Sequence, residues 1–173
     1  MQKLRSLLGL PVLEIDGGTQ IGEVLEVVLS IERAAFVGLV IGGSSWFGQE
    51  RGILFADIYA IGRDAVTVRS AEAVQDFAAV LAADGVDKLA VLSDKPVYSE
   101  TGDFLGRVAD VLCNADTGEV RFYELSDGLI TDLLSGRRLM PLPVAQVMNE
   151  DRLIVPEAMA SLLPADHDSG GVV

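Results

Sequence analysis

The sequence predicts an all-β protein with one or two short helices, built as two tandem small β-barrels. Three observations support this prediction. Of the 173 residues, 50% are hydrophobic and only 6% are aromatic, so the core of the folded chain must be mainly aliphatic. Glycine occurs 18 times, which indicates many tight turns. The same order of short strands and turns occurs twice along the chain.

An internal repeat organises the chain. Residues 11–22 (PVLEIDGGTQIG) resemble residues 96–106 (PVYSETGDFLG), and the second copy is slightly shorter. A strand that begins with glycine follows, GEVLEV in the first copy and GRVADV in the second. Further along, IYAI at 58–61 corresponds to VAQV at 144–147, and a short apolar strand follows each of them. Because the order of elements is shared, the sequence predicts two copies of one folding unit.

Turn and strand signals alternate within each copy. A glycine-rich turn precedes a predicted strand over 22–30, and residues 36–41 (FVGLVI) are typical of a strand buried on both sides. In the second copy, residues 116–119 predict a hairpin turn and residues 120–126 predict the strand after it. Glycines inside strands are interpreted as structural residues at bulges or sharp bends that let a small barrel close. These glycines are Gly22, Gly38 and Gly106.

A helix is predicted between the two copies. Apolar residues that recur at helical spacing, on one face, are Val74, Phe77, Ala78 and Leu81. Ser70 is suited to begin this helix and Gly85 to end it. A second short helix is predicted after Pro156. The expected organisation is a first barrel, a linking helix, a second barrel, and a short helix with a disordered tail, at residues 1–69, 70–86, 87–156 and 157–173.

The charge balance is strongly acidic. Thirteen Lys and Arg stand against 26 Asp and Glu, which gives a formal net charge of −13. Nucleic-acid binding requires a basic surface that neutralises phosphates, and an anionic membrane repels an acidic protein. We therefore expect no direct nucleic-acid contact. The long apolar stretch at residues 34–41 is far too short to span a membrane, so no membrane insertion is expected. A protein partner is expected, and a basic one is compatible with the charge.

Residues that could carry catalysis or bind a metal are scarce. Cys113 is the only cysteine and His167 the only histidine, so a disulfide or a zinc site cannot be built from them. Cys113 is expected to be a small buried hydrophobe in a strand. Residues 43–50 have the glycine spacing of a phosphate-binding loop, but Gln49 and Glu50 stand where Lys and Ser or Thr are needed. The sequence thus predicts no catalytic, metal-binding or cofactor-binding residues.

The doubled pattern resembles the PRC-barrel family in tandem. The resemblance depends on GEVxxV at 22–27 and GRVxxV at 106–111, and on the valine and glycines that precede each strand. It also depends on the apolar segments at 58–61 and 144–147, and it covers nearly all of residues 6–156. The resemblance implies a small SH3-like barrel for each copy.

The resemblance also implies a kind of function. The family includes the cytoplasmic domain of the H subunit of the purple bacterial photosynthetic reaction centre. It also includes the C-terminal domain of a maturation factor of the small ribosomal subunit, which binds a ribosomal protein. The family has no shared catalytic residues, so the resemblance implies a protein that is not an enzyme.

A loop of the first copy is a candidate partner-binding site. Trp46 and Phe47 lie between glycine and serine residues, and such aromatic residues are enriched at the hot spots of interfaces. The alternative is that the pair folds back and caps the barrel, or packs on the other half of the chain.

The corresponding segment of the second copy, residues 128–138, shares no close sequence with that loop. Leu129 and Leu133 lie at helical spacing and could form a turn of helix over the barrel or a surface patch. Arg137 and Arg138 are the only adjacent basic pair. They could form ion pairs with nearby acids such as Asp132, or they could dock an acidic partner or a carboxylate.

The leading hypothesis is a non-enzymatic interaction or adaptor module of the bacterial cytoplasm that binds a protein partner through barrel loops. Two alternatives follow from the resemblance. One is a ribosome-maturation-type factor that contacts a ribosomal protein. The other is a peripheral partner of a membrane complex of the photosynthetic type. Two pseudo-equivalent copies are also compatible with a homodimer.

Overall fold

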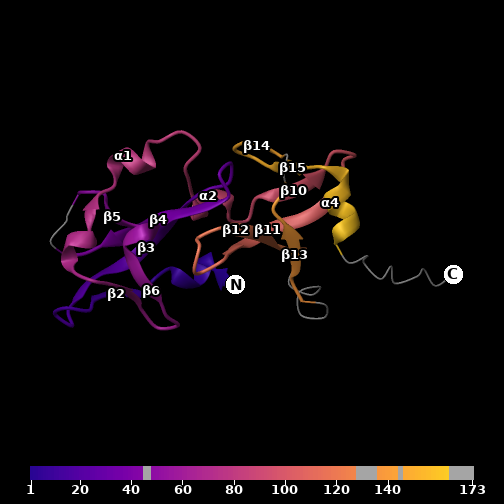
Figure 1. Cartoon of the computed structure of the whole chain (residues 1–173). Coiled ribbons are helices and arrows are strands. Elements are labelled where there is room, and N and C mark those ends of the chain that lie inside the picture. Colours follow the sequence, from indigo (N-terminus) through magenta and orange to yellow (C-terminus); the bar gives the residue numbers. More distant parts are fainter. Residues whose placement is uncertain (45–47, 128–135, 144–145, 164–173) are drawn as a thin grey trace. The chain divides into compact units, whose positions relative to one another are not determined.

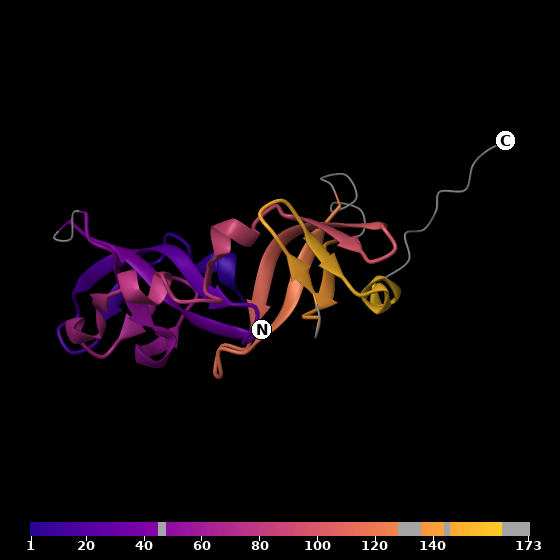
Figure 2. The same cartoon turned by 90° about the horizontal axis from the view of Figure 1, so that it is seen from above.

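Two sheets of β-strands form the framework of the chain, as the computed structural model shows for residues 1–44, 48–127, 136–143 and 146–163 (Figure 1). Each sheet is strongly curled (Figure 2). Backbone contacts divide the chain into two units. Unit 1 comprises residues 1–93 and 110–122, and unit 2 comprises residues 94–109 and the described residues from 123 onward. The predicted fold class, all-β with short helices, is confirmed.

The first sheet lies in unit 1. Its strands are β2 (Pro11–Glu14), β3 (Gln20–Ser30), β4 (Ala35–Gly42), β5 (Arg51–Leu54), β6 (Ile58–Ile61), β7 (Val66–Val68), β8 (Gln75–Asp76) and β9 (Asp87–Lys88). Their order is β6-β7-β2-β3-β4-β5-β8, and β9 pairs with β3 beside this path. The helices α1 (Ala78–Leu81) and α2 (Leu89–Leu92) are each one turn long.

The second sheet has the order β13-β12-β11-β10-β15-β14. Its strands are β10 (Pro96–Ser99), β11 (Phe104–Cys113), β12 (Val120–Ser126), β13 (Arg138–Pro141), β14 (Val147–Met148) and β15 (Leu153–Val155). The N-terminal strand β1 (Gln2–Lys3) pairs with the end of β11. The helix α4 (Glu157–Leu162) follows Pro156. Among the described residues, no helix is long and apolar enough to cross a membrane.

The repeat is visible in the strand register. Strand β2 pairs antiparallel with β3 and parallel with β7, and β10 pairs in the same way with β11 and β15. Val12 lies opposite Gly22, and Val97 lies opposite Gly106. In both copies the antiparallel register shifts directly after this valine. The similarity of the two sequences therefore reflects two copies of one strand arrangement.

A carboxylate also holds the chain after the last strand of each copy. The backbone N–H of Ala71 donates to Glu14 at 3.0 Å, and that of Glu157 donates to Glu100 at 3.3 Å. In each copy 57 residues separate the two partners. In the second copy, hydrogen bonds from Thr101 and then Ser99 hold the pKa of the Glu157 carboxyl below its usual range. These contacts attach the end of each copy to its beginning.

The single helix predicted over 70–86 is not formed. Residues 71–73 make a 3₁₀ turn, β8 follows, and only Ala78–Leu81 is α-helical. The reason is the burial of Phe77, which has no exposed surface. A Cβ added at Gly52 would lie 2.4 Å from the Phe77 ring, and one at Gly38 would lie 2.9 Å from it. The chain must be extended before Phe77 so that β8 pairs with β5 and the ring reaches this space.

Residues of the second copy complete unit 1. The N–H of Phe36 donates to Gly118 O at 2.8 Å, and the N–H of Val120 donates to Ala34 O at 2.8 Å. These bonds join the turn between β11 and β12 to the strands of the first copy. The N-terminal 3₁₀ turn is held there too, because buried Asp110 accepts a hydrogen bond from the N–H of Arg5 at 2.9 Å. The side chains of this turn that face the core, Leu4 and Leu7, are completely buried.

We expect Gly106→Ala to destabilise the protein more than Gly102→Ala. Both glycines have positive φ, +126° and +95°, so alanine at either position costs about 1–2 kcal/mol of backbone strain. An added Cβ at Gly102 meets nothing within 4 Å, whereas at Gly106 it would lie 2.9 Å from Ser126 O. This contact should cost about 1–3 kcal/mol more. Urea unfolding followed by circular dichroism measures the difference, and equal losses in the two variants would contradict the steric explanation.

Candidate partner-binding site

Leu25 is an exposed leucine in strand β3, in which Val24 and residues 27–30 are buried. A β-bulge follows from the register of β3 against β4: Val24 lies opposite Ile41 and Glu26 lies opposite Val40, so Leu25 is the extra residue. The Glu26 side chain accepts a hydrogen bond from the N–H of Val27 at 2.9 Å. Leu25 points outward, opposite to buried Val24, as in a regular strand, and 59% of the residue is exposed. The bulge places Glu26 on the same outer side and returns Val27 to the buried side.

Two shallow grooves meet beside Leu25. One, of about 460 Å³, is lined by Leu25, Val40, Gly42 and residues 48–50 among others. The other, of about 510 Å³, is lined by residues 20–23, Gly42, residues 43–44 and Ala71. Both include Gly42 and Gly43, where β4 leads into the loop of residues 43–50. The absence of a Cβ at Gly42 makes room for Leu25, because an added Cβ would lie 2.8 Å from Leu25 Cδ1.

The rim of these grooves is acidic. Glu23 lines one groove and Glu50 lines the other, and both residues are exposed. Among the described residues, neither carboxylate has an ion-pair partner. The arrangement therefore combines an apolar residue, a floor of backbone and aliphatic groups, and uncompensated negative charge. Such a surface suits binding of an apolar anchor in a basic partner.

Four of the predicted site residues lie outside the described residues, namely Trp46, Phe47, Leu129 and Leu133. The structure does describe both arms of the loop that carries Trp46 and Phe47. Gly43 and Ser44 form one arm and residues 48–50 form the other, and all of them are exposed. Leu25 and its grooves lie at the base of this loop.

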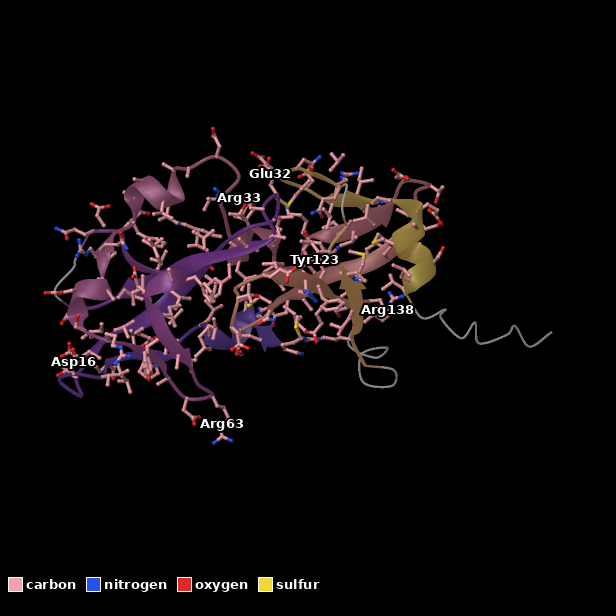
Figure 3. The ribbon with its side chains drawn as sticks, viewed as in Figure 1. Asp16, Glu32, Arg33, Arg63, Tyr123 and Arg138 are labelled. Carbon is pink, nitrogen blue, oxygen red and sulfur yellow. The ribbon has the colours of Figure 1, made fainter. Side chains whose placement is uncertain are left out.

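The two predicted arginines differ in their surroundings. Arg138, on β13 (Figure 3), forms an ion pair with Asp127 at 3.1 Å and donates to Leu105 O at 2.7 Å. Its side chain is only 15% exposed, which is typical of a structural role. Arg137 pairs with buried Glu124 at 3.3 Å, and 47% of the Arg137 side chain is exposed. Of the two, Arg137 is therefore the more accessible to solvent.

Of the cysteine and the histidine, only Cys113 lies in the part of the chain that the structure describes. Cys113 is completely buried, and His167 lies outside the described residues. In the part of the chain that the structure describes, no group of three or more His, Cys, Asp and Glu side chains could hold a metal ion.

Sequence reasoning missed Leu25. A signal was available, because Glu23 and Glu26 are three residues apart and would lie on opposite faces of a regular strand. A bulge between them brings both acids to the outer side while Val24 and Val27 stay buried. The break in alternation therefore predicts a bulge in this strand, and the regular alternation before it predicts that Leu25 lies on the outer side with Glu23.

The buried thiol leads to a testable dependence of stability on pH. Burial raises the pKa of the Cys113 thiol from 9.0 to about 11. Between these values the unfolded thiol loses its proton while the folded one keeps it, so the free energy of unfolding falls as pH rises. Below pH 9 the contribution is complete. We expect Cys113→Val to lose less stability than the original chain between pH 9 and 11, measured by urea unfolding. Identical slopes in the two proteins would contradict this.

Comparison with known proteins agrees with the repeat. The family model described as the PRC-barrel domain matches residues 1–75 and 84–163. The first segment contains β2 to β7 and the second contains β10 to β15, the strands that correspond in register. A search of curated proteins found no match. The chain belongs to the PRC-barrel family and carries two tandem copies of its domain.

Proposed function

We propose that this protein is a non-enzymatic interaction module of the bacterial cytoplasm, which binds a protein partner through the surface at Leu25 and the adjoining loop of residues 43–50. The exposed Leu25, which lies at a β-bulge beside two grooves, is the single observation that carries the proposal. Membership of the PRC-barrel family supports an interaction role in general.

The physical argument begins with the exposure of Leu25. Burial of a whole leucine side chain in an interface contributes about 1.5–3 kcal/mol, and 59% of Leu25 is available for it. Trp46 and Phe47 belong to the loop that starts beside this leucine, and aromatic anchors often dominate binding energy. Leu25 and the aromatic pair together would supply the apolar centre of an interface.

The charge argument concerns the partner. Glu23 and Glu50 flank the apolar residues, and the whole chain carries a net charge of −13. Such a field accelerates the approach of a basic protein and repels acidic ones. Arg137 in unit 2, with Leu129 and Leu133 from the neighbouring segment, is a candidate for a second contact.

The proposal predicts that one partner depends on Leu25. Crosslinking and affinity capture of the intact chain should recover a defined protein. Leu25→Ser, and separately the double change Trp46→Ala and Phe47→Ala, should reduce its recovery at least about tenfold, which corresponds to about 1.4 kcal/mol of binding energy. Mass spectrometry identifies the partner, and its identity separates a ribosomal protein, a membrane complex and another basic protein.

Val147→Ser is the matched control for this experiment. Val147 is 65% exposed and lies in unit 2, so its replacement removes a similar apolar surface elsewhere. Circular dichroism checks that each variant is folded. If the folded Leu25 and loop variants capture every protein that the original chain captures, Leu25 and the loop are not the binding surface.

A further inference from the structure

Another groove of unit 1, of about 440 Å³, lies where the chain enters β6. It is lined by Asp57, Tyr59, Arg69 and Glu72 together with alanine and isoleucine side chains. None of its residues lines the grooves beside Leu25. It therefore forms a separate surface, and it combines an aromatic ring with charges of both signs.

Tyr59 offers an aromatic face to cations. The residue is 56% exposed, and the guanidinium carbon of Arg69 lies 4.4 Å from the centre of its ring. The electron-rich face of a tyrosine attracts Lys and Arg side chains in this geometry. Arg69 thus shows, within the chain itself, the kind of group that this ring binds.

The two carboxylates of the groove, those of Asp57 and Glu72, are available to pair with a cation. Asp57 accepts one long hydrogen bond, 3.5 Å, from the side-chain amide of Gln75. Among the described residues, neither Asp57 nor Glu72 has a basic side chain within ion-pair distance. Although Arg69 lies in the same groove, it is stacked on the tyrosine and pairs with neither acid.

The groove is also held in place by backbone contacts. The N–H of Asp16, in the turn between β2 and β3 (Figure 3), donates to Arg69 O at 3.2 Å. Glu14 accepts the hydrogen bond from Ala71 that orders the 3₁₀ turn carrying Glu72. Tyr59 lies within β6, which pairs with β7. A preorganised surface loses little conformational freedom when it binds.

We infer that this groove binds a basic segment of a protein partner. A lysine or arginine side chain of that segment lies against Tyr59 and pairs with Asp57 and Glu72. The aromatic ring and the two unpaired acids are the groups that recognise a cation. Arg69 competes for the same ring and repels the incoming charge. The inference rests on the proposed function in one respect, namely that the protein binds another protein. It does not depend on the surface at Leu25.

Labelled ten-residue peptides test the inference. Fluorescence anisotropy compares the intact chain with a lysine- and arginine-rich peptide, a glutamate-rich peptide and a neutral peptide. The basic peptide alone should bind. Tyr59→Leu and Glu72→Gln should each weaken its binding at least about fivefold, whereas Arg69→Gln should strengthen it.

Two matched variants separate a site from general attraction to an acidic protein. Tyr59→Phe keeps an aromatic face and should keep the binding. Asp84→Asn removes the same charge as Glu72→Gln, but from an exposed turn that does not line the groove. Equal weakening by Asp84→Asn and Glu72→Gln, or binding of the glutamate-rich peptide instead, would overturn the inference.

Complete failure to bind the basic peptide would also overturn it. That failure would leave the proposed function standing, because capture of a partner through Leu25 is measured independently with the Leu25→Ser variant. Conversely, groove-dependent binding of the basic peptide without any Leu25-dependent partner would support this groove and contradict the proposed surface.

Discussion

The structure of unit 1 depends on backbone hydrogen bonds that the second copy supplies. The turn between β11 and β12 donates and accepts hydrogen bonds at Val120 and Gly118, which satisfy the backbone of Ala34 and Phe36. Gly118 has φ of +72°, and its lack of a Cβ leaves room for the Phe55 ring, since an added Cβ would lie 2.8 Å from that ring. Unpaired backbone groups in a buried position are costly, so the first copy requires this turn.

The two copies use the same bulge-forming strand for different purposes. Glu26 and Asp110 occupy corresponding positions, and each accepts a hydrogen bond from the next residue along the strand, at 2.9 and 2.8 Å. Asp110 is buried and also holds the N–H of Arg5. The residue before each of these acids also differs in exposure between the copies. Leu25, in the first copy, is 59% exposed, whereas Ala109, in the second, is only 8% exposed. The first copy exposes this part of the strand to solvent, whereas the second buries it inside the fold.

Unit 1 accordingly carries the features that favour binding. Exposed Leu25 and Tyr59 lie at separate grooves, and each groove has carboxylates without a described basic partner. Unpaired negative charges repel one another and give little to stability, so a partner that neutralises them gains binding energy. At both proposed binding surfaces, uncompensated negative charge lies beside an exposed apolar or aromatic group. This shared feature is the physical reason for proposing each of them.

The sequence by itself determined the two copies, their aliphatic core and most strands, because turns and apolar runs are local signals. The strand predicted over 120–126, for example, coincides with β12. Only the tertiary structure decided that residues 74–76 are extended rather than helical, since this conformation depends on the space that Gly38 and Gly52 leave for Phe77. The tertiary structure also decided that Arg69 stacks on the ring of Tyr59 and that the β11–β12 turn forms backbone hydrogen bonds with the first copy. These features depend on contacts between residues far apart in the chain, which local patterns do not encode.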